Sequence, residues 1–270
     1  MIIKSVLKIR TVCPSSIILA LLFQLQAYGL SPIKNEETQI HTGNKILIVV
    51  TNSDHLPGDT SNHGWGVLMR EVGAFYGALY QHEIKLNDIG IVSPHGGPVP
   101  VLSFFDDFPG NLRIPEQDKK ELRKMLSQTM TPEQVNPDDY HVIYYAGGFS
   151  CLVDFPGSEQ IGKIASRIYE RGGIVCATCD GVAGIIPIKL SNGNFLVNKI
   201  KITTNHYRKS KDKLNVRDQL KSQGAIIESS SLVSDHKVIT ARGVRPVQVA
   251  EEVAAILGLT SDRSKVRTSN

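Results

Sequence analysis

Short apolar runs alternate along the chain with longer segments whose apolar residues recur every three or four positions. The run at 45–50 is rich in Ile and Val, which is typical of a parallel strand buried on both faces. Runs of this kind predict strands at 45–50, 89–93, 140–146, 172–178, 201–204 and 237–240. Helical spacing predicts helices at 66–80, 115–128, 158–171, 216–222 and 246–257. Strands alternating with helices indicate an α/β fold with a doubly wound, mostly parallel sheet and helices on both faces.

Polar segments with turn chemistry separate several of these elements. Asn-Pro-Asp-Asp at 136–139 predicts a turn, and Ser-Asn-Gly-Asn at 191–194 predicts a hairpin turn between two short strands. Nothing in the pattern indicates an internal repeat or an interdomain linker. We therefore expect one domain at 44–258.

The first 29 residues have the pattern of a cleaved secretory signal. Three basic residues precede an apolar stretch at 17–23, and Ala-Tyr-Gly at 27–29 places small residues at the minus-three and minus-one positions. The stretch is shorter than the roughly 20 residues that a membrane span needs, so no membrane association is expected after cleavage. We expect a secreted or periplasmic protein; an uncleaved leader is the alternative. A flexible lead-in at 30–43 and a polar tail at 259–270 would flank the domain.

The charge of the chain lies largely in this leader. The whole sequence carries a formal net charge of +4, and the leader holds three basic residues and no acidic one, so the remainder carries +1. A nearly neutral chain without a basic stripe argues against a nucleic-acid partner. The remaining length of roughly 240 residues suits one α/β domain with a full core.

The segment 172–184 has the sequence of a nucleophile elbow, in which a buried strand, a sharp turn and a helix follow one another. Cys179 stands at the turn, and small residues follow it because strand and helix backbones approach closely there. The dipole of the following helix would favour its thiolate. Sites in open α/β sheets gather at the carboxyl ends of strands, where Gly147-Gly148 and Glu71 are also expected. Cys179 could instead be a structural cysteine in a buried strand, and Glu71 could be a solvated charge on its helix.

Three cysteines remain after the expected cleavage: Cys151, Cys176 and Cys179. An odd number leaves at least one thiol unpaired in an exported chain. Cys176 and Cys179 have CxxC spacing, which occurs in redox and zinc motifs, and neither reading is favoured because the pair lies on a predicted strand without a second ligand pair. No metal or cofactor is expected. A disulfide that involves Cys151 at the site stays an open alternative.

These segments together resemble the ThiJ/PfpI superfamily, which shares the flavodoxin-like fold of class I glutamine amidotransferases. Within it, the sequence is most similar to the branch of glyoxalase III and heat-shock chaperone-like proteins. The matching features are short, but their order and spacing are specific and extend from about 45 to 257. They are Gly66 with Glu71, 91–94 with Gly96-Gly97, 136–140, 146–148, 154–156, the elbow, 189–193 and 238–240.

The resemblance implies a role for each matching residue. Cys179 corresponds to the nucleophile and Glu71 to the acid that contacts its sulfur, while the N–H groups of Gly148 and Asp180 would form the oxyanion site. The implied reaction converts methylglyoxal to lactate without a cofactor, as part of a stress response. Deglycation, peptidase action and holdase chaperoning are related activities of the superfamily, and a homodimer is the expected assembly.

The sequence departs from this branch at the residues that would handle protons. The branch reads Cys-His-Gly at the elbow, where this chain has Cys179-Asp180-Gly181, so Asp180 replaces the expected base. It also favours Gly-Gly-His-Gly, where this chain has Gly147-Gly148-Phe149-Ser150, and a Glu-Glu pair near 206–209. We hypothesise that Asp180 instead pairs with a basic group in that last segment. The further residues that could surround these catalytic groups are Gly147, Cys151, His206, Arg208 and Lys209.

We therefore expect a cysteine-dependent enzyme that acts on small reactive carbonyls, with Cys179, Glu71 and Asp180 as its catalytic residues. The alternative is a catalytically degenerate member that works as a holdase chaperone or a cysteine redox sensor. A hydrolase or hydratase that uses the same thiol is a third reading.

Overall fold

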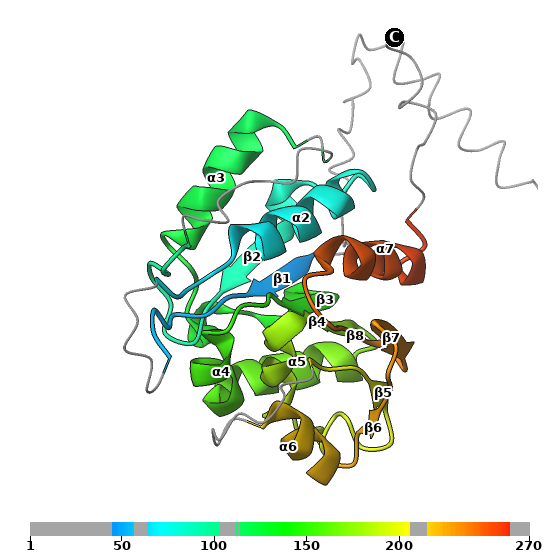
Figure 1. The fold of residues 1–270 in the computed structure, drawn as a ribbon. Helices are drawn as coiled ribbons and strands as arrows, with labels where there is room; N and C mark the ends of the chain where they lie inside the picture. Colours follow the sequence, from blue (N-terminus) through cyan, green and yellow to red (C-terminus); the bar gives the residue numbers. More distant parts are fainter. Residues whose placement is uncertain (1–44, 57–63, 103–111, 113, 206–214, 260–270) are drawn as a thin grey trace, which may run out of the picture. The chain divides into compact units, whose positions relative to one another are not determined.

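The computed structural model describes residues 45–56, 64–102, 112, 114–205 and 215–259, and within them the main sheet has six strands. Their order is β2-β1-β3-β4-β8-β7 (Figure 1). The strands are β1 (Ile46–Val49), β2 (Ile89–Val92), β3 (Val142–Tyr145), β4 (Ile174–Thr178), β7 (Leu232–Asp235) and β8 (Val238–Ala241). All neighbours pair in parallel except β7, which pairs antiparallel with β8 at the edge. The prediction of an α/β fold with a mostly parallel sheet is confirmed.

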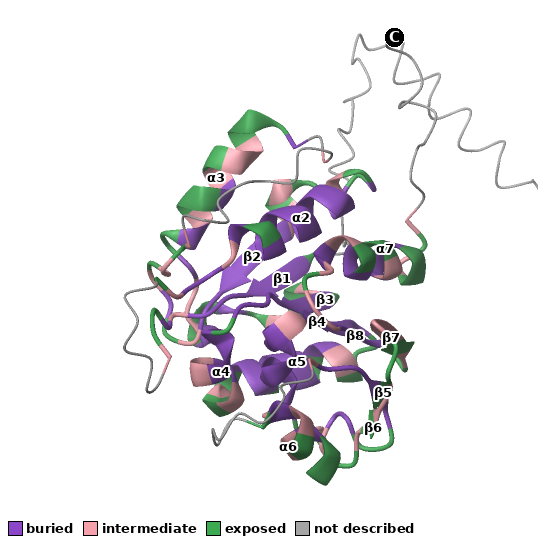
Figure 2. Cartoon of the chain, in the orientation of Figure 1, coloured by how far each residue is buried: buried purple, intermediate pink, exposed green. Residues whose placement is uncertain are grey.

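The central strands are apolar on both faces because each face packs against its own layer. Every residue of β1, β2, β3, β4 and β8 is buried (Figure 2). In β3, Val142 and Tyr144 face one hydrophobic cluster, whereas Ile143 and Tyr145 face the other. This alternation explains why the strands read as continuous apolar runs in the sequence.

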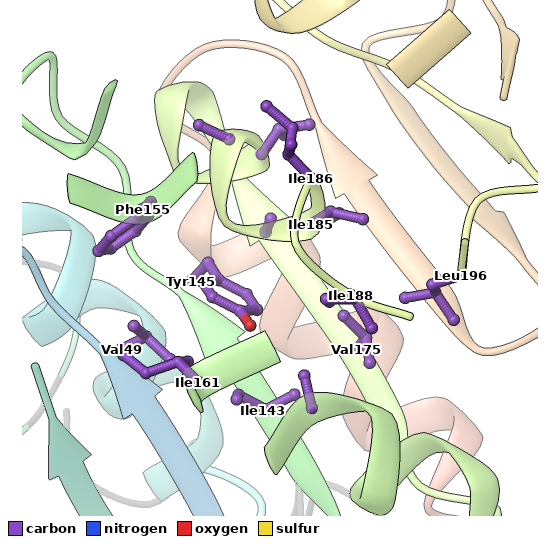
Figure 3. Close-up of a cluster of buried hydrophobic side chains, with 14 of the residues drawn as sticks. Val49, Ile143, Tyr145, Phe155, Ile161, Val175, Ile185, Ile186, Ile188 and Leu196 are labelled. Carbon is purple, nitrogen blue, oxygen red and sulfur yellow. The ribbon is translucent and has the colours of Figure 1, made fainter. Parts of the chain in front are cut away.

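Helices cover the two faces of the sheet in two groups. One cluster holds side chains of α2 (Met69–Tyr80), α3 (Glu116–Leu126) and α7 (Pro246–Ile256) (Figure 1). The other cluster holds side chains of α4 (Cys151–Asp154), α5 (Glu159–Glu170) and α6 (Val216–Ser222), and Tyr145 lies at its centre (Figure 3). No helix in the described part of the chain combines the length and apolar character that crossing a bilayer requires.

The structure differs from the sequence-based expectation mainly beyond residue 186. The turn at 191–194 is present, but its flanking strands reduce to one antiparallel bridge between Lys189 and Phe195. The predicted strand at 201–204 is β5 (Lys201–Ile202), which pairs with β6 (Ile226–Ile227) in a separate small sheet. The sequence pattern missed β6, α4 and the edge strand β7. The expected leader, lead-in and polar tail lie outside the described residues, apart from the first position of the tail, Leu259.

The turn between β7 and β8 shows why the edge strand was missed. His236 and Lys237 both have positive φ angles, of 47° and 63°. This is the backbone of a tight hairpin turn, for which Asn-Gly or Asp-Gly is the usual signal. A His-Lys pair is not such a signal, so the sequence does not predict the hairpin.

Candidate active site

The turn after β4 places Cys179 in a strained conformation at the carboxyl edge of the sheet. Its φ angle is +52°, a region that residues other than glycine rarely occupy, and holding it costs of order 1–3 kcal/mol. The chain then enters a short 3-10 helix, η6 (Cys179–Ile185). An added Cβ at Gly181 would collide with the carbonyl oxygen of Tyr145, and one at Gly184 would collide with the Tyr145 ring. Close packing of this turn on β3 therefore requires the small residues of the elbow.

The Gly147-Gly148 segment after β3 forms a gap beside the cysteine. An added Cβ at Gly147 would lie 2.6 Å from Cys179 Cβ and 3.0 Å from Glu71 Oε1, so both groups approach this one glycine. Gly148 has a φ angle of +137°, and its added Cβ would lie 3.2 Å from the carbonyl oxygen of Gly66. The gap allows Glu71 to reach the neighbourhood of the thiol.

Glu71 lies in the first turn of α2 and is fully buried, so the reading of a solvated helix charge is wrong. Its Oε2 accepts hydrogen bonds from Thr178 Oγ1 at 2.5 Å and from the Tyr144 hydroxyl at 3.0 Å. Burial raises the pKa of Glu71 to about 7, although these two hydroxyls favour the charged form. Within the described residues, Oε1 makes no hydrogen bond, and the N–H of Gly147 also lowers the pKa of Glu71.

Asp180 and Asn205 both contact the sulfur. The Cys179 thiol donates to Asp180 Oδ2 at 3.4 Å, and Asn205 Nδ2 donates both to Cys179 Sγ at 3.3 Å and to Asp180 Oδ1 at 3.1 Å. Burial raises the pKa of Asp180, an effect that its hydrogen bonds oppose. The carboxyl is held beside the thiol that precedes it in the chain.

The thiol of Cys179 is held in its neutral form. Burial, followed by the charges of Asp180 and Glu71, raises its pKa to about 12. The Asn205 amide and the Asp180 N–H favour the thiolate, but they do not outweigh burial. The N–H of Asp180 in the elbow thus favours the thiolate, as the sequence predicts, but burial and the two carboxyl charges outweigh this contribution. Such a thiol reacts slowly through its small thiolate fraction, and faster when a neighbour accepts its proton as the new bond forms.

The other cysteines are buried thiols with structural contacts. Cys151 donates to the carbonyl oxygen of Ala146 at 3.2 Å, and Cys176 donates to the carbonyl oxygen of Ile143 at 3.4 Å. Burial raises the pKa of both thiols. All three cysteines of the described region are unpaired, so neither a 176–179 disulfide nor a Cys151 disulfide is present. No group of three or more metal-ligating side chains is found in the described ranges.

Several residues at the site were not expected from the sequence. Asn205 directly follows the predicted strand at 201–204, and its position at a strand end was the signal that could have found it. Thr178 and Tyr144 lie within apolar strands, and no sequence pattern there indicates that their hydroxyls contact a carboxylate. His206, Arg208 and Lys209 lie outside the described residues, so their pairing with Asp180 stays a prediction.

Comparison with known proteins gives partial matches to enzymes described as glyoxalases. The chain is 33% identical over 101 residues to a probable glutathione-independent glyoxalase, hsp3103, of Schizosaccharomyces pombe, covering 36% of this chain and 38% of that protein. It is 40% identical over 63 residues to the glutathione-independent glyoxalase HSP31 of Saccharomyces cerevisiae, covering 23% and 27%. The matched part therefore spans less than two fifths of these relatives.

Solved structures share the fold over a longer part of the chain. The Rapid Encystment Protein (24 kDa) of Francisella tularensis has a TM-score of 0.65 and 26% identity, covering 80% of this chain and 99% of that one. Glyoxalase III of Candida albicans has a TM-score of 0.58 and 21% identity, covering 80% and 97%. The model of one family matches residues 114–255, which is more than half of the sequence and includes the Cys179 turn. The chain belongs to the DJ-1/PfpI family, in the branch similar to the glutathione-independent glyoxalases.

Proposed function

We propose that the protein is a cysteine-dependent enzyme for small reactive carbonyls, with the conversion of methylglyoxal to lactate as its leading reaction. The observation that carries the proposal is a partly exposed thiol flanked by two buried carboxyl groups with raised pKa values. With a pKa of about 7, Glu71 exchanges protons readily near neutral pH, and the isomerisation of a carbonyl needs this. Similarity to glutathione-independent glyoxalases supports the same reaction. Deglycation would be a related reaction of the same thiol.

In the first step, Cys179 Sγ adds to the aldehyde carbon. Because the thiol is neutral, its proton leaves as the S–C bond forms, and Asp180 Oδ2 is the acceptor that the thiol already contacts at 3.4 Å. The S–H bond breaks, an O–H bond forms on Asp180, and the carbonyl π electrons move to oxygen. In this proposal the N–H groups of Gly148 and Asp180 stabilise the oxyanion.

In the second step, Glu71 moves a proton between the two carbons. With a pKa of about 7, comparable amounts of both its forms exist at neutral pH. The oxyanion first takes the proton back from Asp180, which completes the hemithioacetal. Glu71 Oε1 then takes the proton from the former aldehyde carbon and returns it to the neighbouring carbon, while the hydroxyl proton of the former aldehyde moves to the neighbouring oxygen. The product is a lactoyl thioester. Water then hydrolyses the thioester, lactate leaves, and the sulfur recovers its proton. The net change is the addition of one water to methylglyoxal.

One observation favours a second candidate, a catalytically degenerate holdase chaperone. A pKa of about 12 leaves on the order of one Cys179 thiol in 10⁵ ionised at pH 7. The same observation disfavours a redox sensor, because oxidation by peroxide also requires the thiolate. Peroxide titration of Cys179 followed by mass spectrometry separates these two alternatives.

The test is to incubate the purified protein with methylglyoxal and to follow lactate formation. We expect the wild type to form lactate, Cys179→Ala to form none, and Cys176→Ala to act as a matched control with unchanged activity. Asp180→His shows whether the carboxylate suffices as the base. No lactate from the wild type, with activity appearing in Asp180→His, would refute the proposed reaction.

A further inference from the structure

Asn205 is fixed at the sheet edge by the residues that precede it. The N–H of Thr203 donates to Thr240 Oγ1 of β8 at 2.8 Å, and Thr203 Oγ1 donates to the carbonyl oxygen of Ser230 at 2.7 Å. Thr203 is fully buried. The first bond ties the residue after β5 to β8, which pairs with β4, the strand that ends just before Cys179. The backbone thus brings Asn205 to the thiol from a distant part of the sequence.

A backbone group determines which way the Asn205 amide points. The N–H of Gly243 donates to Asn205 Oδ1 at 2.8 Å. Because a backbone N–H can only donate, the oxygen of the amide must face Gly243, and its nitrogen must face the site. The two hydrogens of Nδ2 are then directed to Cys179 Sγ and Asp180 Oδ1, at 3.3 Å and 3.1 Å.

We infer that Asn205 is a positioning residue that holds Cys179 and Asp180 as a proton-transfer pair. The inference rests on the proposed role of Cys179 as a nucleophile. When the thiol proton moves to Asp180 Oδ2, the negative charge moves from the carboxylate to the sulfur. One N–H of Asn205 already contacts each of these two groups, so the amide does not have to turn during the transfer. A histidine is not needed for this arrangement.

The Asn205 amide shifts the pKa of Cys179 and the pKa of Asp180 in the same direction. Its hydrogen bonds lower the pKa of Cys179 and the pKa of Asp180, which burial raises. Among the described residues, the other titratable groups whose charges couple to the thiol are Glu71 and Cys151. In the part of the chain that the structure describes, neither has a hydrogen bond to the sulfur, whereas the Asn205 side chain and the Asp180 N–H both lower the pKa of the thiol.

The test measures alkylation of Cys179 by iodoacetamide between pH 7 and 10, with mass spectrometry to identify the modified residue. In Asn205→Ala, we expect the rate to fall three- to tenfold at each pH below the thiol pKa, because the thiolate loses a donor. The matched control is Thr204→Val, which removes a neighbouring buried hydroxyl that donates to the carbonyl oxygen of Asn205. An Asn205→Ala rate within twofold of the wild type at every pH would overturn the inference.

A second variant keeps the test decisive if Asn205→Ala fails to fold. Asn205→Asp retains an oxygen acceptor for the Gly243 N–H and loses both donors, so we expect slower alkylation than in the wild type. Equal rates in Asn205→Asp and the wild type would count against the inference. Alkylation requires no carbonyl substrate, so its outcome is independent of lactate formation. Lactate absent from the wild type would refute the proposed function and leave the alkylation result standing.

Discussion

The two carboxyl groups beside Cys179 are held in different ways. Glu71 is held from within the sheet by the hydroxyls of Thr178 and Tyr144, which both contact the same oxygen. Asp180 is held at the sheet edge by an amide that also contacts the thiol. Both carboxyls are buried, but only Asp180 accepts a hydrogen bond from the sulfur. Similar side chains thus receive different environments, which is how two carboxyls in one site acquire different roles.

The comparison teaches that burial alone does not define the chemistry of a carboxyl. Glu71 has one oxygen saturated with donors and the other without a hydrogen bond in the described region, facing the glycine gap. Asp180 has one oxygen on each partner, the amide and the thiol. We therefore assign proton transfer at carbon to Glu71 and proton transfer from sulfur to Asp180. Four substitutions test this division of roles.

Glu71→Gln is expected to have the largest effect, because it removes the acid and base of the carbon step. We expect carbonyl turnover to fall roughly a thousandfold, within the range for loss of a general acid–base group. Circular dichroism and the exposed-site control Glu121→Gln, on α3, separate lost chemistry from lost folding. Turnover within tenfold of the wild type would contradict the assignment.

The same variant should change how stability depends on pH. The folded pKa of Glu71, about 7, lies above its ordinary value of 4.5. Protonated Glu71 therefore favours the folded state; this contribution is complete below pH 4.5 and is lost as the pH rises through 7. Between pH 4.5 and 8 the wild type should lose about 3 kcal/mol more unfolding free energy than Glu71→Gln. Urea unfolding at several pH values measures the difference, and parallel curves would contradict the raised pKa.

Gly147→Ala should lower turnover, because the added methyl group fills the gap between Glu71 and the thiol. The new methyl group would meet Cys179 Cβ at 2.6 Å and Glu71 Oε1 at 3.0 Å, so one of them has to move. Displacement of reacting groups by about 1 Å can cost a hundredfold in rate, and we expect a loss of that size. Gly157→Ala is the matched control, because an added Cβ there meets nothing within 4 Å. Equal activity in both variants would show that the gap is not needed.

Asp180→Asn should separate the reactivity of the thiol from turnover. The variant removes a charge that raises the pKa of Cys179, so alkylation at pH 8 should become up to tenfold faster. Turnover of methylglyoxal should fall about tenfold, because the thiol proton loses its acceptor. The exposed Asp138→Asn serves as the control for charge removal. If alkylation and turnover change in the same direction, Asp180 does not act as the acceptor.

The sequence predicts the parts of this site that have a backbone cause. The apolar run before Cys179 and the small residues after it follow from close packing of the turn on Tyr145, and the glycines at 147–148 follow from the narrow gap. Each of these features restricts the residue size or the φ angle at a position, so the residue types in the sequence indicate it. The central strands are predicted for a similar reason, because burial on both faces makes them apolar throughout.

The parts that the sequence could not predict depend on tertiary contacts of ordinary polar residues. Asn205 reaches Cys179 only because Thr203 is tied to Thr240, and no local pattern marks that contact. Glu71, in α2, is held by hydrogen bonds from Tyr144 in β3 and Thr178 in β4, far from it in the sequence. The β7–β8 hairpin was missed because its turn uses His236-Lys237, whose positive φ angles contradict the usual preference of these residues. Long-range polar contacts and unusual turns are thus the limits of the sequence argument.

Tyr144→Phe should have the smallest effect and is the finest test of how Glu71 is held. The variant keeps the stacking of the ring on Phe75, with ring centroids 3.8 Å apart, but removes one donor to Oε2. Because that donor favours the charged form, the pKa of Glu71 should rise further above its ordinary value. One hydrogen bond is worth about 1 kcal/mol, so turnover at pH 7 should fall a few-fold, and its pH profile should shift to higher pH. A lower rate with an unshifted profile would mean that Tyr144 contributes to the site by packing and not by lowering the pKa of Glu71.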